Sequence, residues 1–276
     1  MGPGETTLHG RLLGARIREK RQATGLTLVE ASKRMKRRPS SLSRWETGDR
    51  IPHPAELLYA LEVYGVRGGE RDALMRLGEE AYERPESPDV VSVAVADYDW
   101  LERRAYRVEG VWDVALPGLL QTPDYARAVL KAWDPAVGKE RIERTLAARM
   151  ARRPRLAGDD VLELCAILGE GTLRAAVGGP EVMRAQLLHL LDCAALPSVE
   201  LRILPFAAGA HAGFAGRFTI LRFRDDRDLA HITTRGGDIY FEDAVPFDQA
   251  QRRIKAVALS QKESVAMIAA ATKEMT

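Results

Sequence analysis

The stretch Leu26–Gly48, LTLVEASKRMKRRPSSLSRWETG, has the clearest structural pattern in the chain. Its first half carries apolar and small residues at helical spacing, which predicts a short helix with one inner face: Leu28, Ala31, Ser32 and Met35. Thr27 is a favourable N-cap for this helix, and Glu30 completes a capping box three residues later. We therefore expect the helix to begin at Thr27.

A second short helix is predicted over residues 39–47, after the basic turn Lys36-Arg37-Arg38. Pro39 stands at the first helical position, where its missing N–H costs nothing. Leu42 and Trp45 are spaced to face inward, and Gly48 ends the helix as a C-cap glycine does. Two short helices joined by a tight turn, the second presenting small polar residues and an arginine, indicate a helix-turn-helix motif.

The motif lies within a predicted bundle of five helices that spans residues 10–83. The flanking helices are expected over residues 12–24, 55–64 and 70–82, each with an apolar stripe. Residues 1–9 resemble a disordered tail. Residues 84–97, RPESPDVVSVAVAD, have the composition of a linker, in which residues 90–96 fit either a strand or the start of a helix.

Charge is distributed unevenly over the 276 residues, whose net charge is only +2. Residues 1–50 contain twelve Lys or Arg and five Asp or Glu, whereas the rest of the chain contains 29 and 34. A basic N-terminal region on a mildly acidic protein predicts a polyanionic partner for that region alone. The length favours two domains, and no apolar run is long enough to predict a membrane span or a secretory signal.

Residues 98–276 mix strand-like and helical patterns without strict alternation. Apolar runs of strand length alternate irregularly with amphipathic stretches: residues 161–168, 199–204, 218–223 and 239–241 for the strands, and 122–133, 137–152 and 181–195 for helices. The predicted fold class is therefore mixed: an all-α five-helix bundle followed by an α+β domain with a mainly antiparallel sheet.

Residues 10–66 resemble the repressor-type helix-turn-helix of the XRE family. The resemblance rests on Leu26-Thr27, Ala31, the run SSLSRWE over residues 40–46, Gly48 and Pro52. It implies that the helix over residues 39–47 enters the major groove and that double-stranded DNA is the partner. The implied base-contacting residues are Arg38, Pro39, Ser40, Ser43 and Arg44, and the implied backbone-contacting residues are Thr27, Arg37, Arg50 and His53.

Arg44 is the strongest candidate for base reading, because a guanidinium can bond guanine O6 and N7 together. Trp45 is expected to fill the bundle core, and Glu46 to pair or cap inside the bundle, since phosphates repel a carboxylate. Pro39 departs from the family pattern, in which many relatives carry a polar residue at this early position. Direct readout is therefore expected to be thinner here, and phosphate binding relatively larger.

The second half resembles the uncharacterised C-terminal domain found behind XRE motifs in many actinobacterial regulators. The matching blocks are LPGLLQTPDYARAVL at 116–130, VGGPEVMRAQLLHLL at 177–191, LPFAAGAHAGFAGRF at 204–218 and VALSQKESVAMI at 257–268. Members of that group resemble developmental and antibiotic-production regulators. Many are encoded beside a small partner protein, and some are described as antitoxin-like. The resemblance carries no catalytic chemistry.

A catalytic or ligand site in the second half would have to use scattered residues. Glu170, Arg202 and His211 are the candidates, with His211 in a glycine-rich loop as a general base or a structural residue. No metal-ligand spacing and no cofactor motif is present, so neither a metal nor a cofactor is expected. Cys165 and Cys193 lie in apolar sequence and are expected to be buried reduced thiols.

The sequence as a whole favours a DNA-binding transcriptional regulator rather than an enzyme. We expect a homodimer that reads two half-sites, with a C-terminal domain that senses a small-molecule effector or a partner. The alternative is an antitoxin-like protein that binds a small neighbour-encoded protein, with DNA binding as autoregulation. An enzyme fused to a DNA-targeting module is the weakest alternative. The expected location is the cytoplasm, at the nucleoid when the protein is bound to DNA.

Overall fold

The structure is a computed structural model that describes residues 7–82, 90–92, 98–235 and 237–275. The chain divides into two compact units. The first comprises residues 1–98 with residues 234–242, and the second comprises residues 99–233 with residues 243–276. The first unit therefore includes a short segment from late in the chain, whereas the sequence pattern predicted one continuous N-terminal domain.

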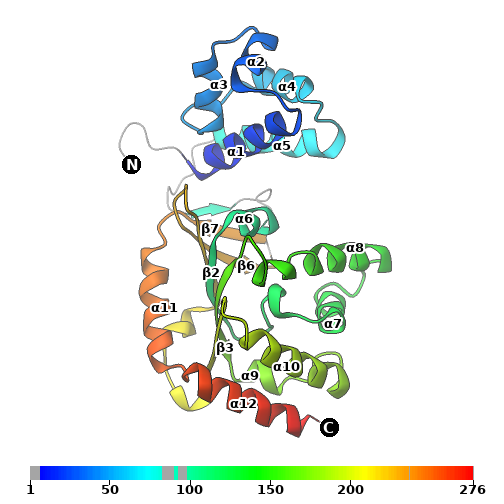
Figure 1. The fold of residues 1–276 in the computed structure, drawn as a ribbon, viewed down its shortest axis with the longest axis vertical. Helices are drawn as coiled ribbons and strands as arrows, with labels where there is room; N and C mark the ends of the chain where they lie inside the picture. Colours follow the sequence, from blue (N-terminus) through cyan, green and yellow to red (C-terminus); the bar gives the residue numbers. More distant parts are fainter. Residues whose placement is uncertain (1–6, 83–89, 93–97, 236, 276) are drawn as a thin grey trace. The chain divides into compact units, whose positions relative to one another are not determined.

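The N-terminal bundle consists of five helices, as predicted (Figure 1). These are α1 (Leu8–Ala23), α2 (Leu28–Arg34), α3 (Pro39–Glu46), α4 (Pro54–Val63) and α5 (Gly68–Tyr82). Thr7 caps α1 by accepting a hydrogen bond from the amide of Gly10. Leu8 and His9 are helical and buried, so the predicted tail over residues 1–9 is too long at its C-terminal end. Residues 1–6 lie outside the described part of the chain.

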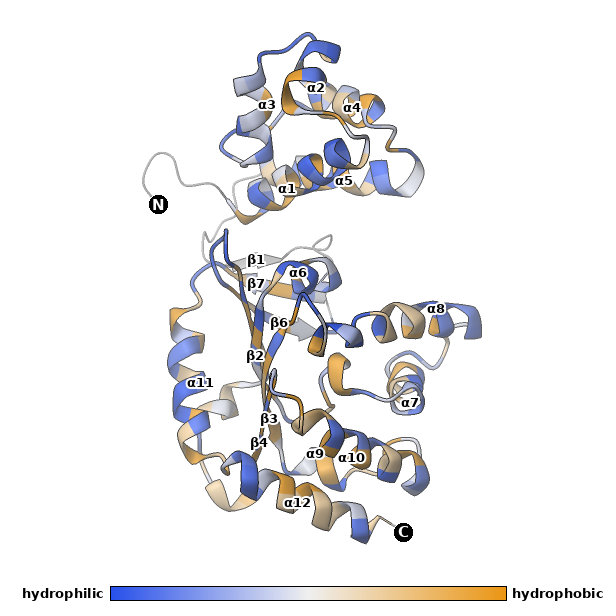
Figure 2. Ribbon diagram, in the orientation of Figure 1, coloured by the Kyte–Doolittle hydropathy of each residue, from blue (hydrophilic) through white to orange (hydrophobic). Residues whose placement is uncertain are grey.

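The bundle core forms where the apolar faces of the helices meet (Figure 2). Ile17, Leu42, Trp45 and Leu61 are each no more than 2% exposed. Gly14 allows α1 to approach α3 closely, because a Cβ at this position would lie only 2.4 Å from the carbonyl oxygen of Trp45. α1, which was predicted as a flanking helix only, thus packs directly against the end of α3.

The first unit also contains a short two-stranded ladder. β1 (Val90–Ser92) pairs antiparallel with β7 (Gly237–Phe241), with Val91 opposite Tyr240. Of the two structures left open for residues 90–96, the strand is confirmed over residues 90–92. The rest of the predicted linker, residues 84–89 and 93–97, lies outside the described residues.

The second unit is built on a mixed sheet. Its strands are β2 (Arg107–Trp112), β3 (Glu163–Gly169), β4 (Val199–Leu204), β5 (Phe218–Arg222) and β6 (Leu229–Thr234), in the order β6-β5-β2-β3-β4. β5 runs antiparallel to both β2 and β6, but β3 runs parallel to β2 and to β4. The predicted α+β class is confirmed, and the sheet is mixed, with antiparallel pairings at β5 and parallel pairings at β3.

Helical connections explain the two parallel ladders, because parallel neighbours need a crossover between them. α7 (Pro123–Trp133) and α8 (Lys139–Met150) join β2 to β3, and α9 (Gly171–Arg174) and α10 (Pro180–Ala194) join β3 to β4. Short 3₁₀ turns occur at η1 (Gly118–Leu120), η2 (Arg153–Leu156), η3 (Phe206–Ala208) and η4 (Ala212–Ala215). α6 (Tyr98–Arg104) precedes the first strand of this unit. α11 (Val245–Val257) and α12 (Gln261–Glu274) follow its last strand and end the chain's regular structure.

Helices cover both faces of this sheet: α7 and α10 lie on one side of it and α11 on the other (Figure 1). Residues 164–168 of β3 are consequently buried in succession, with no alternation of inner and outer side chains. A strand covered on both faces reads as a continuous apolar run, and residues 161–168 show such a run in the sequence. Cys165 and Cys193 are buried free thiols, as predicted.

Candidate nucleic-acid interface

The inner side of the motif is fixed by apolar packing and by one buried ion pair. Leu42 and Trp45 of α3 are 1% and 2% exposed, as predicted from their spacing. Glu46 is buried and accepts two hydrogen bonds from Arg21 of α1, from Nε at 2.6 Å and from Nη2 at 2.9 Å. Glu46 therefore pairs inside the bundle, as expected, and belongs to the scaffold of α3.

Arg21 faces the inside of the bundle. Its side chain is buried, and its Nη1 also donates to the carbonyl oxygen of Leu26 at 2.7 Å. The bond to Glu46 raises the pKa of Arg21 despite its burial. Tyr64 lies in the same electrostatic environment, and burial together with the Glu46 charge raises its pKa. One arginine thus ties α1, the entry to α2 and the end of α3 together.

The two motif helices begin differently. Thr27 caps α2 in a complete capping box, in which its hydroxyl accepts from the amide of Glu30 and the Glu30 carboxylate accepts from the amide of Thr27 at 2.8 Å. The Thr27 hydroxyl also donates to the Glu30 carboxylate at 2.7 Å, and this bond together with that from the Thr27 amide lowers the pKa of Glu30. At the start of α3, Arg38 occupies the N-cap position without a side-chain capping bond, and Pro39 follows at the first helical position. The cap and the proline position are both confirmed.

The outer side of α3 carries the residues that the sequence assigned to base contacts. Arg38, Pro39, Ser40 and Arg44 are exposed, and Ser43 is half-buried. Within the described residues, neither the guanidinium of Arg38 nor that of Arg44 makes a hydrogen bond or an ion pair. α3 ends after Glu46, and Gly48 follows with φ +78°, the left-handed conformation expected of a C-cap glycine.

Three residues assigned to the DNA backbone meet around Glu56 of α4. Arg37 lies 2.9 Å from Glu56 Oε1 and Arg50 lies 3.7 Å from Oε2, measured from Nη2 in both cases. His53 is the N-cap of α4, and its amide donates to Glu56 Oε2 at 3.0 Å. Arg37, Arg50 and His53 are exposed, whereas Glu56 is half-buried behind them. We call Arg37, Arg50, His53 and Glu56 the Glu56 cluster.

Thr27 does not belong to the Glu56 cluster. Its hydroxyl and its amide are both engaged with Glu30, whose carboxylate lies at the same helix end. A carboxylate at that position opposes a phosphate, so the capping box counts against a backbone contact by Thr27 itself.

Sequence reasoning missed Arg21 and Glu56. Arg21 pairs with a residue 25 positions away, a separation that no local periodicity reveals. Glu56 could have been found, because it stands three residues after His53 and forms a second capping box with it.

The second unit does not bring its three candidate residues together. Glu170 accepts from the amide of Phe206 at 3.0 Å and pairs with Arg174, Arg202 pairs with Glu200 at 2.8 Å, and His211 accepts from the amide of Gly213 at 3.1 Å. Among the described residues, Glu170, Arg202 and His211 share no hydrogen bond or ion pair. In the part of the chain that the structure describes, no group of three or more His, Cys, Asp or Glu is placed to hold a metal ion.

A family model also matches the N-terminal region that resembles a helix-turn-helix. A model described as a helix-turn-helix domain covers residues 12–74, which include α2 and α3, and this match supports DNA as a partner. A second model, described as a domain of unknown function, DUF5753, covers residues 95–270. Because this match spans more than half of the chain, the protein belongs to the DUF5753 family.

Searches among curated proteins and among solved structures give no significant match to this chain. In the part of the chain that the structure describes, no helix is both long and apolar enough to cross a membrane.

Proposed function

We propose that this protein is a sequence-specific DNA-binding transcriptional regulator that places α3 in the major groove. The observation that carries the proposal is Arg44. It is exposed on α3, and its guanidinium makes no hydrogen bond or ion pair within the described residues. Leu42 and the Arg21–Glu46 pair hold the other side of the same helix. A guanidinium on a fixed helix keeps its N–H donors in a planar fork, the geometry that matches guanine O6 and N7.

The neighbouring residues support α3 in this role. Ser40 and Ser43 can bond a base edge or a phosphate oxygen, and Arg38 stands ahead of the first turn. Pro39 has no N–H, so it can contact a thymine methyl group but cannot donate a hydrogen bond. Arg44 therefore carries most of the proposed direct readout, with Arg38 as an auxiliary.

The Glu56 cluster is the proposed phosphate-binding part of the interface. Arg37 and Arg50 each present an exposed guanidinium, and each is paired only with the half-buried Glu56 carboxylate in the described structure. Arginine donates to phosphate in a bidentate manner, and such contacts set the register of the protein on the duplex without reading sequence.

One helix-turn-helix bundle contacts few base pairs, so useful specificity requires two copies. We propose a homodimer in which two α3 helices read half-sites about one helical turn, roughly 34 Å, apart on the DNA. The second unit is proposed to sense a small effector or a partner and to act without catalysis. The whole protein is proposed to be in the cytoplasm, and at the nucleoid when it is bound to DNA.

A second candidate function is an antitoxin-like protein that binds a small protein encoded beside it and represses its own synthesis. The observation that favours a protein partner is the glycine-rich loop after β4, where Phe206 is 70% exposed and Phe214 is 72% exposed. Purification from a strain that also expresses the adjacent gene separates the two candidates. A stoichiometric second protein supports this candidate, and its absence supports a sensor of small molecules.

The test of base reading begins with the DNA that the protein binds in cells, which sequencing identifies. Binding of the resulting operator and of a scrambled duplex is then measured by fluorescence anisotropy at fixed salt. Arg44→Ala should cost about 1–3 kcal/mol on the operator and much less on the scrambled duplex.

The matched control for this test is Arg76→Ala, which removes an exposed arginine from α5, away from the motif. It should leave both affinities unchanged. Equal losses by Arg44→Ala on the two duplexes would overturn the base-reading role.

A further inference from the structure

Lys36, in the turn between α2 and α3, has an unusual backbone conformation. Its φ is +51°, in the left-handed region. In the part of the chain that the structure describes, the other residues with positive φ are all glycines. A side chain disfavours this region, because Cβ then lies too close to the following carbonyl oxygen. The turn therefore carries a lysine where the backbone favours glycine.

Backbone hydrogen bonds hold Lys36 in this conformation. Its amide donates to the carbonyl oxygen of Lys33 at 3.1 Å. The next amide, of Arg37, reaches back to the carbonyl oxygen of Ser32 at 2.9 Å. The second bond closes the C-terminus of α2 as in a Schellman motif, whose left-handed position is usually a glycine. Lys36 can relax its backbone only by opening the turn that leads into α3.

The side chain of Lys36 has no role in the fold that would offset this strain. It is exposed, and within the described residues its ammonium group makes no hydrogen bond or ion pair. The next residue, Arg37, is instead paired with Glu56 at 2.9 Å. The lysine thus keeps a full, unneutralised charge at a position where the backbone holds its Cα in one place.

Lys36 lies beside the Glu56 cluster. Lys36, Arg37 and Glu56 line one cavity of about 380 Å³, and the rest of its wall consists of Met35, Trp45, Ala55 and Tyr59. Within the Glu56 cluster, Arg37 and Arg50 share a single carboxylate. Lys36 adds a third cation on the same side of the bundle, two residues before Arg38 at the N-cap of α3.

We propose that Lys36 contacts a DNA phosphate next to the Glu56 cluster, and that the strained turn presents this contact. The proposal rests on the proposed DNA binding and adds a residue to the interface. An ammonium group is a compact charge without the planar fork of a guanidinium, so it neutralises a phosphate without reading a base. The contact therefore raises the affinity for any duplex and adds no sequence discrimination.

Two substitutions separate the charge of Lys36 from its backbone strain. Lys36→Met keeps a long side chain in the strained turn and removes the charge. It should weaken binding to the operator and to the scrambled duplex alike, by about threefold to tenfold at moderate salt. The slope of log K against log salt should become shallower by about one unit, because one counterion-releasing contact is lost. The melting temperature of the free protein should not change.

Lys36→Gly removes the charge and the strain together. It should weaken DNA binding as much as Lys36→Met does. It should also raise the melting temperature of the free protein by roughly 2–4 °C, because glycine enters the left-handed region without a Cβ clash. A residue with a purely structural role would not combine a more stable fold with weaker binding to both duplexes.

The measurements are fluorescence anisotropy over a series of salt concentrations and thermal unfolding followed by circular dichroism. Lys36→Arg retains the charge and should keep the wild-type affinity and salt slope. Lys131→Met removes an exposed lysine from α7 of the second unit and is the matched control. It should change neither the affinity nor the salt slope.

The outcomes distinguish this contact from the proposed function. Wild-type protein that binds neither duplex would overturn both. Wild-type binding whose affinity and salt slope survive Lys36→Met would overturn the contact alone. A loss confined to the operator would overturn the phosphate assignment, and a lower melting temperature for Lys36→Gly would overturn the strained presentation.

Discussion

Arg222 in the second unit and Arg44 in the bundle differ in whether their guanidinium groups are paired with carboxylates. In the second unit, Arg222 bonds Glu109 at 3.1 Å, Asp228 at 2.8 Å and Asp248, so that β2, the β5–β6 loop and α11 are joined through one side chain. Burial lowers the pKa of Arg222, but its bonds to Asp248 and Asp228 outweigh burial and raise it. In the bundle, Arg44 has no such partner among the described residues.

This difference separates arginines that build the fold from arginines that remain available for a partner. Arg21 in the bundle belongs with Arg222, because both satisfy their donors internally. Arg44 belongs with Arg104 and Arg224 of the second unit, whose guanidinium groups lie over the rings of Trp100 and Tyr106 and have no carboxylate partner among the described residues. The pairing state of each arginine, which the count of basic residues does not give, separates the two groups.

The largest expected effect comes from breaking the buried pair. Glu46→Ala leaves the buried Arg21 charge without its partner and should lower the free energy of unfolding by about 3–5 kcal/mol, measured by chemical denaturation. Arg21→Met combined with Glu46→Leu removes both charges and should recover most of the loss. A single-variant cost below about 1 kcal/mol would place Arg21 with the available arginines instead.

An intermediate effect is expected at Glu200 on β4. Burial alone would raise its pKa, but hydrogen bonds from Lys255 and Arg202 lower it from 4.5 to about 2. The stabilisation is present above pH 4.5 and is lost as the pH falls through about 2. Glu200→Gln should cost about 1–2 kcal/mol at pH 7, allowing for solvent screening, and should flatten the pH dependence of unfolding in acid.

The control for Glu200 is Glu163→Gln, which removes the exposed partner of Arg107. An exposed ion pair contributes about 0–1 kcal/mol, so this variant should change acid unfolding little. If both variants reduce the pH dependence of unfolding in acid equally, the loss of stability at low pH does not come from Glu200 in particular.

The smallest effect is expected in the Glu56 cluster, where the exposed Arg37 and Arg50 share one carboxylate. Glu56→Gln removes a negative charge beside Arg37 and Arg50, and it should strengthen binding to operator and to scrambled DNA alike, by less than about 1 kcal/mol. The slope of log K against log salt should steepen by about one unit, since one more phosphate contact releases counterions. Weaker binding would show that Glu56 positions the two arginines for DNA.

The motif was predictable because its signals are local. Thr27 with Glu30, Pro39 at a helix start, and the spacing of Leu42 and Trp45 each depend on residues within one or two helical turns. The fold class of the second half followed from its mixed periods. The parallel order β2-β3-β4 did not, because strand order depends on where crossover helices pack rather than on the pattern of any strand.

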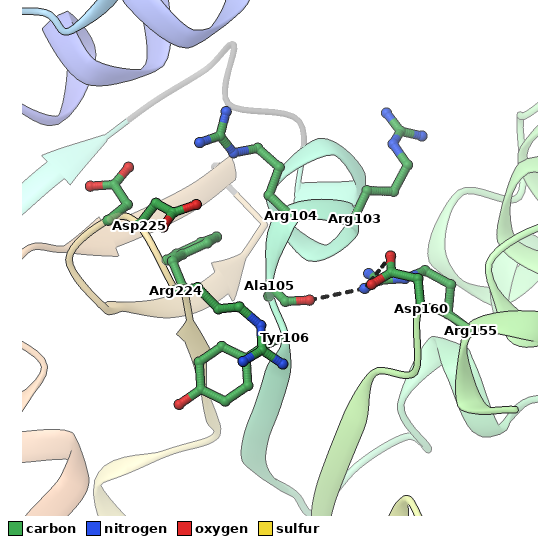
Figure 3. Close-up of a pocket in the computed structure, with 10 residues that line it drawn as sticks. Arg103, Arg104, Ala105, Tyr106, Arg155, Asp160, Arg224 and Asp225 are labelled. Carbon is green, nitrogen blue, oxygen red and sulfur yellow. Dashed lines mark hydrogen bonds and ion pairs between the residues drawn. The ribbon is translucent and has the colours of Figure 1, made fainter. Parts of the chain in front are cut away.

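A small pocket of the second unit, between the end of α6, the segment from η2 to β3 and the β5–β6 loop (Figure 3), was not predictable for a related reason. Its lining comes from three segments that lie far apart in the chain, around Arg104, Arg155 and Arg224. Conversely, Glu170, Arg202 and His211 were grouped by residue type alone, and each is bonded to a different partner: Phe206, Glu200 and Gly213, respectively. Residue chemistry identified candidate groups, but only tertiary structure decides which groups meet.

The unequal capping of the two motif helices has a consequence for amide hydrogen exchange at their N-termini. α2 closes its own N-terminus through Thr27 and Glu30, whereas no side chain closes that of α3. The amide of Glu30 should therefore exchange its hydrogen slowly and the amide of Ser40 quickly in the free protein. Bound DNA supplies acceptors at the open end, so the Ser40 amide becomes a reporter whose exchange slows only while α3 occupies the groove.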